Sequence, residues 1–276
     1  MQRVHVDGIE IAFEEHGTGT RPLVLLHGFT GYRQDFATQL DALARHGRLI
    51  VPDLRGHGDS GHAVDPADYG LDQLRADLVG LLDALDVERC DLLGHSMGGM
   101  VALRAVLAHP DRFASLLLMD TAPGPLPWMN RDQLALASRV ALEAGMQSLA
   151  TILRARAKDD TERGEPDRRL EERWGEARFW HWRESRIAAM DPHAYAAFGL
   201  ALVEQEDLTP RLGAIGVPTT VLVGALDREF RGPAEVLARE IPDAMLVVLP
   251  EGGHQPQHEA PEAWLGAVAA HLERVR

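Results

Sequence analysis

The chain has 276 residues, of which 45% are hydrophobic and 25% charged, a balance typical of one folded globular domain. Its net charge of -14 would repel phosphate backbones and anionic lipid headgroups, so neither nucleic acid nor a membrane surface is an expected partner. The N-terminus has no secretory pattern, no segment is apolar enough to span a bilayer, and the single cysteine, Cys90, cannot form an internal disulfide. We therefore expect a cytoplasmic protein, monomeric or homodimeric.

The first half of the sequence alternates between strand and helix patterns. Asp7-Gly8 favours a tight turn, which predicts a hairpin of strands 3–6 and 9–15. Short apolar runs without polar alternation are typical of strands covered on both faces. They occur at 22–26, 49–51, 92–93 and 113–119. Helical patterns separate them at 36–45, 71–85 and 97–109.

The second half resumes this alternation only after a long helical stretch. Residues 128–209 contain helical patterns but no convincing strand, whereas 217–223 and 245–249 again read as strands. A final helix is expected over 263–275. The pattern predicts an α/β fold, with a mostly parallel eight-stranded sheet, an N-terminal antiparallel hairpin and helices on both faces. We expect a core formed by residues 1–124 and 210–276, and a helical lid, or cap, at 125–209.

A serine lies between a predicted strand and a predicted helix, in the sequence Gly94-His95-Ser96-Met97-Gly98. A G-x-S-x-G in this context is typical of a sharp turn that projects a nucleophilic hydroxyl, because glycines two residues either side avoid steric collision. Taken alone the pattern is weak in a chain with 26 glycines. Other features have to support it.

Acyl transfer also needs backbone amides that stabilise an oxyanion. Met97 supplies one candidate amide, because it directly follows the serine. Phe29 supplies the second, because it follows His27-Gly28 at the end of a predicted strand. We interpret His27 as a residue that holds this loop rather than one that transfers protons.

A base and an acid are expected at the carboxyl ends of the last two strands, where ligands bind in open α/β sheets. Asp227 follows strand 217–223, and His254 follows strand 245–249. His254 could accept the Ser96 proton while Asp227 orients its ring. Asp120 also follows a strand and is an alternative acid. His57 and His258 are interpreted as a loop residue and a surface residue.

The sequence contains no HExxH, no Cys/His cluster and no phosphate-binding glycine motif, so we expect neither a metal nor a cofactor. Four of the five tryptophans fall in the predicted lid. Most should pack lid helices onto the core, but some could line an apolar pocket above Ser96. The candidate pocket residues are Met100, Trp128, Trp180 and Trp182.

Together, the HGF segment at 27–29, PDLRGHGDS at 52–60, GHSMGG at 94–99, GALD at 224–227 and GGH at 252–254 resemble the α/β-hydrolase superfamily. The resemblance covers residues 4–120 and 217–276. It implies a catalytic triad of Ser96, Asp227 and His254, with Phe29 and Met97 forming the oxyanion hole. A serine nucleophile differs from the aspartate used by the haloalkane dehalogenases and epoxide hydrolases of the superfamily.

Our main hypothesis is a serine hydrolase, carboxylesterase-like, acting on a small, fairly apolar ester, lactone or thioester. A C-C bond hydrolase is an alternative. Thr30-Gly31 and the DREF sequence at 227–230 also resemble the menaquinone-pathway lyase that eliminates pyruvate, but Met100 replaces the arginine that follows the serine in that enzyme. Lid arginines could compensate, namely Arg139, Arg154, Arg183 and Arg186. A third possibility is a receptor of this fold that binds a ligand without turnover.

Overall fold

A computed structural model describes residues 1–157 and 164–276. Its centre is one eight-stranded sheet in the order β1-β2-β4-β3-β5-β6-β7-β8. The strands are β1 (Gln2–Val6), β2 (Ile9–His16), β3 (Leu23–Leu26), β4 (Leu49–Pro52), β5 (Cys90–His95), β6 (Phe113–Met119), β7 (Thr219–Gly224) and β8 (Met245–Leu249). β2 is antiparallel to both β1 and β4, and the remaining pairs are parallel. The predicted fold class is confirmed.

The N-terminal hairpin forms at the predicted turn. Val6 pairs with Ile9, and both residues between them have positive φ, 42° at Asp7 and 80° at Gly8. Two consecutive left-handed residues match the right-handed twist of the flanking strands, which is why Asp-Gly is favoured there.

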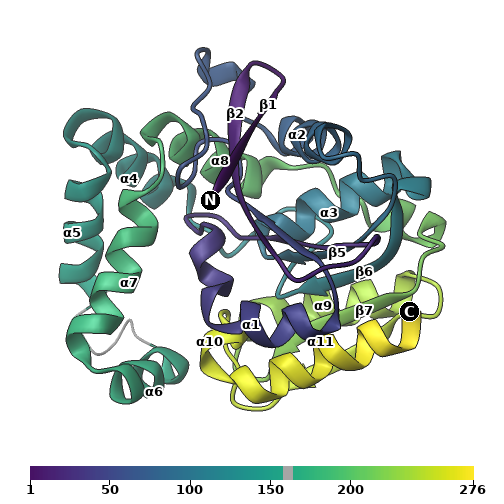
Figure 1. The fold of residues 1–276 in the computed structure, drawn as a ribbon. Coiled ribbons are helices and arrows are strands. Elements are labelled where there is room, and N and C mark those ends of the chain that lie inside the picture. The colour runs from purple at the N-terminus through teal and green to yellow at the C-terminus, as the bar shows by residue number, and fades with distance from the viewer. Residues whose placement is uncertain (158–163) are drawn as a thin grey trace.

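Helices cover both faces of the sheet (Figure 1). One apolar cluster joins the sheet to α2 (Leu71–Ala84), α3 (Met97–Ala108) and α9 (Arg228–Glu240). A second joins the opposite face to α1 (Leu40–Leu43) and α11 (Pro261–Val275). The short α10 (Pro256–Glu259) precedes α11. Short 3₁₀ helices lie at η1 (Arg33–Gln39), η2 (Ala44–His46), η3 (Pro66–Asp68), η4 (Pro110–Arg112) and η5 (Thr209–Ala214).

The helix expected over 36–45 is wrong in detail, because η1, α1 and η2 replace one continuous helix. Phe36, Leu40 and Leu43 still reach the same buried cluster. Over so short a segment, spacings of three and four residues fit a 3₁₀ turn as well as an α-helical one. The apolar pattern therefore located the segment without distinguishing its helix type.

Among the described residues, five α-helices lie between β6 and β7, and we call α4 to α8 the insertion. Their bounds are α4 (Arg131–Ala144), α5 (Met146–Ala157), α6 (Glu165–Trp174), α7 (Glu176–Ala188) and α8 (Pro192–Glu204). In Figure 1, α4, α5, α6 and α7 stand beside the sheet rather than against either face. As expected, the described part of this stretch contains no strand. Among all described helices, none has the length and apolarity that a membrane span requires.

Candidate active site

Ser96 lies at the turn between β5 and α3 in a conformation that L residues rarely adopt, with φ 53° and ψ −117°. The end of β6 holds it there. The Ser96 amide donates to the Met119 carbonyl at 2.9 Å, and Thr121 Oγ1 donates to the Ser96 carbonyl at 2.7 Å. A strained backbone that is held on both sides presents a side chain in one fixed direction.

The neighbouring glycines allow other backbone segments to approach this turn. A Cβ atom at Gly98 would come within 2.5 Å of the Leu26 carbonyl oxygen, and one at Gly28 would lie 3.0 Å from the Ser96 Cβ. The loop after β3 therefore passes directly against the serine. This close approach is the physical reason for glycine at both positions.

The structure brings Ser96, His254 and Asp227 together, although 158 residues separate the first two. His254 Nε2 lies 3.1 Å from Ser96 Oγ, and His254 Nδ1 lies 2.7 Å from Asp227 Oδ2. Since an ionised carboxylate only accepts, Nδ1 donates to Asp227, and a neutral ring then leaves Nε2 free to accept from Ser96. Asp227 is 5% exposed, so its charge is shielded from water.

Contacts on both sides fix the loop that carries His254. Glu259 Oε2 accepts from the amides of Gly253 at 2.6 Å and Gln255 at 3.1 Å. His95 Nε2 donates to the His254 carbonyl at 2.7 Å. The Phe230 ring stacks on the His254 ring with centroids 4.7 Å apart. The His254 ring is thus positioned by hydrogen bonds to the backbone around it and by stacking against Phe230.

The loop with the expected oxyanion donor is also held in place. His27 Nε2 accepts from the Leu54 amide at 2.9 Å, which leaves Nδ1 to donate to the Gly28 carbonyl at 2.9 Å. Burial lowers the pKa of His27 to about 3, so its ring is neutral. His27 therefore structures the loop, as interpreted from the sequence. The Phe29 ring stacks on Tyr195 of α8.

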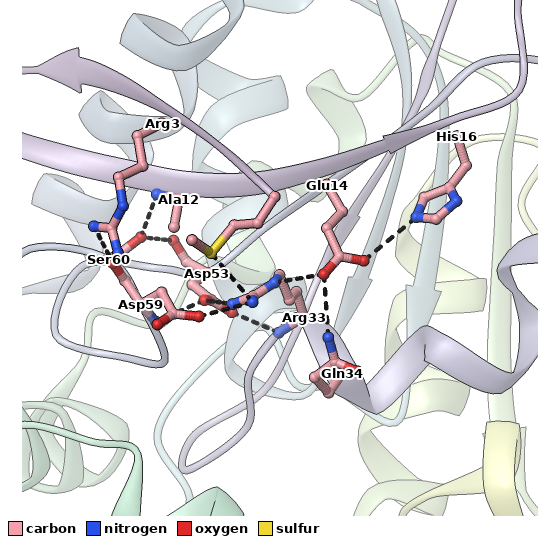
Figure 2. A network of polar contacts seen from close by, with 10 residues as sticks. Arg3, Ala12, Glu14, His16, Arg33, Gln34, Asp53, Asp59 and Ser60 are labelled. Atoms are coloured by element: carbon pink, nitrogen blue, oxygen red, sulfur yellow. Dashed lines mark hydrogen bonds and ion pairs between the residues drawn. The ribbon is translucent and has the colours of Figure 1, made fainter.

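Arg33 ties the same loop to the N-terminal hairpin (Figure 2). Its guanidinium pairs with Asp53, with Glu14 at 2.9 Å and with Asp59 at 2.7 Å. Its backbone amide donates to Asp53 Oδ1 at 2.7 Å. One nearly buried cation thus joins β2, the end of β4 and the segment that follows Phe29.

Asp120, the alternative acid, lies beside Asp227. One oxygen of Asp120, one of Asp227 and one ring nitrogen of His254 lie within 4.8 Å of one another. The hydrogen bond from His254 goes to Asp227. An ion bound through His254 Nδ1 would have to displace that 2.7 Å hydrogen bond.

A cavity of about 430 Å³ opens above Ser96. Two of the four predicted pocket residues, Trp128 and Trp182, line it, together with Phe29 and Phe230. Charged side chains line it as well, namely Asp167, Arg183, Arg186, Asp227, Glu229 and Glu259. The cavity is therefore mixed in character rather than purely apolar.

The other two predicted pocket residues lie elsewhere. Met100 is fully buried in α3, where its sulfur accepts from Gln205 Nε2 at 3.0 Å. Met100 is not among the residues that line the cavity. Trp180 packs with Leu170 and Phe179 inside the insertion. These two predictions are corrected accordingly.

The prediction of a surface position for His258 is wrong. His258 is 4% exposed, and its ring lies 5.1 Å from the ring centroids of both Trp174 and Trp182. Burial lowers its pKa to about 3. His57 is a buried loop residue, as interpreted, with Nδ1 2.9 Å from the Arg55 carbonyl. The histidine hydrogen-bonded to Ser96 Oγ is His254.

Sequence reasoning missed Thr121, Glu259 and the role of His95. Each acts through a backbone group of a residue in the site, and no short motif marks such a contact. The sequence offers only two weak signals for them: Thr121 lies two residues after β6, and Glu259 lies five residues after His254.

Known proteins are similar to this chain in sequence and in fold. The family model described as alpha/beta hydrolase fold matches residues 21–261. The chain is 35% identical over 262 residues to the dihydrolipoyllysine-residue acetyltransferase component of the acetoin cleaving system of Pseudomonas putida, covering 91% of this chain but only 63% of that protein. It is 25% identical, over 98% of its length and 97% of the relative's, to a Bacillus subtilis (strain 168) protein assigned as a 2-succinyl-6-hydroxy-2,4-cyclohexadiene-1-carboxylate synthase.

Among solved structures, a thermophilic esterase from Thermogutta terrifontis is 32% identical with a TM-score of 0.83. That match covers all of this chain and 99% of the esterase. The sheet order, the turn at Ser96 and the family match over most of the sequence lead to one assignment: the chain belongs to the α/β-hydrolase fold family.

Proposed function

We propose that the chain is a serine hydrolase that cleaves a small, fairly apolar carboxylic ester, lactone or thioester. The observation that carries this proposal is the continuous hydrogen-bond path from Ser96 Oγ through the His254 ring to Asp227. A serine hydroxyl is a weak nucleophile unless a base within hydrogen-bond reach removes its proton.

In the proposed reaction, Ser96 Oγ attacks the acyl carbon while His254 Nε2 takes the hydroxyl proton. The amides of Phe29 and Met97 stabilise the resulting oxyanion. His254 then gives the proton to the leaving alcohol or thiol, and an acyl-enzyme forms. Water, deprotonated by the same ring, releases the acid and restores Ser96. Asp227 stabilises the imidazolium without taking its proton.

The cavity supports a substrate of limited size. Its volume of about 430 Å³ and its aromatic side chains suit a small acyl compound better than a polymer or a long lipid chain. We assign residues 125–209 the role of a lid, since Trp128, Trp182 and Arg183 of this segment line the cavity. Substrate preference would then depend mainly on the insertion.

A panel of p-nitrophenyl acetate, butyrate and octanoate, with aliphatic lactones, tests this proposal. We expect the wild type to prefer the short esters and Ser96→Ala to lose at least about 1,000-fold in kcat, as removal of an activated nucleophile does. Ser115→Ala, at a buried serine of β6 outside the site, is the matched control. Retention of most activity by Ser96→Ala would overturn the proposal.

A pyruvate-eliminating lyase is the second candidate. Two observations favour it: Arg183 and Arg186 both line the cavity, and the chain matches nearly the whole length of the Bacillus subtilis relative. Guanidinium groups there could bind a polyanionic substrate. Incubation with the enolpyruvyl precursor should release pyruvate in the wild type but not in Arg186→Met if this function is correct. Ester turnover without pyruvate release would reject it.

A further inference from the structure

Asp120 directly follows β6 and has one carboxyl oxygen without a hydrogen-bond donor. The side chain is fully buried. Oδ1 accepts from the Gly224 amide at 2.9 Å, but Oδ2 has no donor among the described residues. An ionised carboxylate with a bare, buried oxygen carries a large desolvation cost. Its backbone, with φ 44°, is also in a region that L residues rarely adopt.

The other carboxyl group of the site lies close to Asp120. One oxygen of Asp120 and one oxygen of Asp227 lie within 4.8 Å of each other. Two buried carboxyl groups in such proximity can share a hydrogen bond only if one of them carries a proton. Burial, followed by the nearby Asp227 charge, raises the pKa of Asp120 well above its usual value, and Asp227 already accepts from His254. The proton therefore belongs to Asp120.

We propose that Asp120 is a positioning residue, a neutral acid whose Oδ2 proton is donated to the Asp227 carboxylate. Asp227 is then held between two donors, Asp120 and His254, and keeps a single negative charge in a buried site. Asp120 in turn is fixed by the Gly224 amide. This inference rests on the proposed function, because it adds a second carboxyl to the same site.

The proposed arrangement has a specific chemical mimic. In Asp120→Asn, the amide oxygen can accept from Gly224 while the amide nitrogen donates to Asp227, so both contacts of a neutral acid are kept. In Asp120→Leu, a side chain of similar size makes neither contact. An ionised Asp120 would be mimicked by neither variant.

Asp120 also gains a role when Asp227 is neutralised. In Asp227→Asn the like charge is gone, so Asp120 ionises more readily. Its oxygen lies within 4.8 Å of a His254 ring nitrogen and could stabilise the imidazolium in place of Asp227. The double variant Asp120→Asn/Asp227→Asn has no carboxylate at either position.

The first test needs no substrate. Infrared difference spectra of the wild type minus Asp120→Asn at pH 8 should contain the C=O stretch of one protonated carboxylic acid. Absence of this band overturns the proposal. If the band is present while all ester assays fail, the proposed function falls and the Asp120 inference stands.

The second test compares pH profiles of kcat/KM with p-nitrophenyl butyrate. Asp120→Asn should stay within about threefold of the wild type with an unchanged profile. Asp120→Leu should lose about tenfold in kcat at unchanged KM, and its acidic limb should move to higher pH, because an unshared Asp227 charge stabilises the His254 imidazolium more strongly. Equal losses in the two variants, or none in either, contradict the proposal.

The third test uses the Asp227 variants, which remain informative if Asp120→Leu does not fold. Asp227→Asn should retain at least about tenfold more kcat than Asp120→Asn/Asp227→Asn. Equal rates for the single and double variants would contradict a second carboxyl that acts on the same histidine.

Discussion

The carboxyl edge of the sheet and the insertion are built in different ways. At the sheet edge, Ser96, Asp120 and Asp227 follow strands β5, β6 and β7 whose residues are entirely buried. In the insertion, apolar side chains on α4, α5 and α8 are 43–50% exposed. They are Leu136, Leu142, Ile152 and Leu200. Changes at the sheet edge should therefore affect chemistry or folding, whereas changes to the cavity-lining residues of the insertion should affect substrate choice.

Packing inside the insertion supports this contrast. Leu170, Phe179 and Trp180 form a small cluster separate from the two that cover the sheet. The Arg183 guanidinium lies 5.6 Å from the Phe179 ring centroid and 5.9 Å from that of Trp180, and it also pairs with Asp167. The helices α6 and α7 are thus held by a cluster of their own and by partly exposed ion pairs, and can vary with little effect on the sheet. The helices α5 and α8, by contrast, also contribute buried residues such as Leu149 and Phe198 to the cluster on the sheet.

The largest effect is expected at the base. His254→Ala should lower kcat for p-nitrophenyl butyrate by about 10,000-fold with little change in KM, because the ring acts on the Ser96 proton rather than on substrate affinity. Steady-state kinetics checks this, with His62→Ala as a control at an exposed histidine that does not line the cavity. A loss confined to KM would place His254 in binding instead.

The next effect is on folding at the turn. Gly98→Ala should lower the free energy of unfolding by more than about 3 kcal/mol, because the new methyl group meets the carbonyl oxygens of Leu26 and His27. Gly232→Ala, in α9, is the matched control, since a Cβ there meets nothing within 4 Å. This variant should raise the free energy of unfolding by about 0.5–1 kcal/mol, because alanine is favoured over glycine inside a helix. Urea unfolding measures both. Similar stabilities for the two variants would contradict the close packing at the turn.

Two tryptophans of the insertion, two residues apart in sequence, should separate an effect on substrate binding from an effect on stability. Trp182→Ala should raise KM for aromatic esters by about tenfold, because its ring lines the cavity. Trp180→Ala should leave KM unchanged and lower stability by about 3 kcal/mol, since its ring packs inside the insertion. Kinetics and urea unfolding of both variants separate these outcomes. The reverse pattern would mean that Trp180 contacts substrate.

The smallest effect concerns acid stability. Burial lowers the pKa of His27, His57 and His258 to about 3, against about 6.5 unfolded, so the unfolded chain binds more protons between these values. Stability from each neutral ring is complete above pH 6.5 and is lost as pH falls toward 3, by about 1.4 kcal/mol per pH unit. Urea unfolding at pH 7.5, 6 and 5 should show this loss.

His258→Phe isolates one of these rings, since both His258 nitrogens lack a partner in the described structure and the ring contacts two tryptophans. The variant should have a shallower pH slope between 6 and 5, whereas His5→Phe, at an exposed residue, should not. An unchanged slope in His258→Phe would mean that the ring titrates normally.

The sequence allowed the strands, the turn at Ser96 and its two partners to be predicted because each has a local cause. The Asp7-Gly8 turn, the apolar run 113–119 and the glycines around Ser96 depend on short-range sterics and burial. Topology then determines that strand ends meet, which brings Asp227 and His254 toward Ser96.

Other features depend on packing between distant segments and leave no local pattern. Nothing near His258 in sequence indicates that Trp174 and Trp182 cover it. Nor does the sequence indicate that Met100 contacts Gln205, 105 residues away, instead of the cavity. The sequence shows that Asp120 follows a strand. Its proposed protonation, however, depends on its burial and on its proximity to Asp227, which only the structure gives.

The central claim is that Ser96 is the nucleophile, and covalent labelling with a fluorophosphonate followed by intact-mass and peptide mapping tests it most directly. We predict one adduct per chain, located on Ser96, with at least about 100-fold slower labelling in His254→Ala because the hydroxyl then lacks its base. No adduct, or an adduct on a residue other than Ser96, would contradict the account.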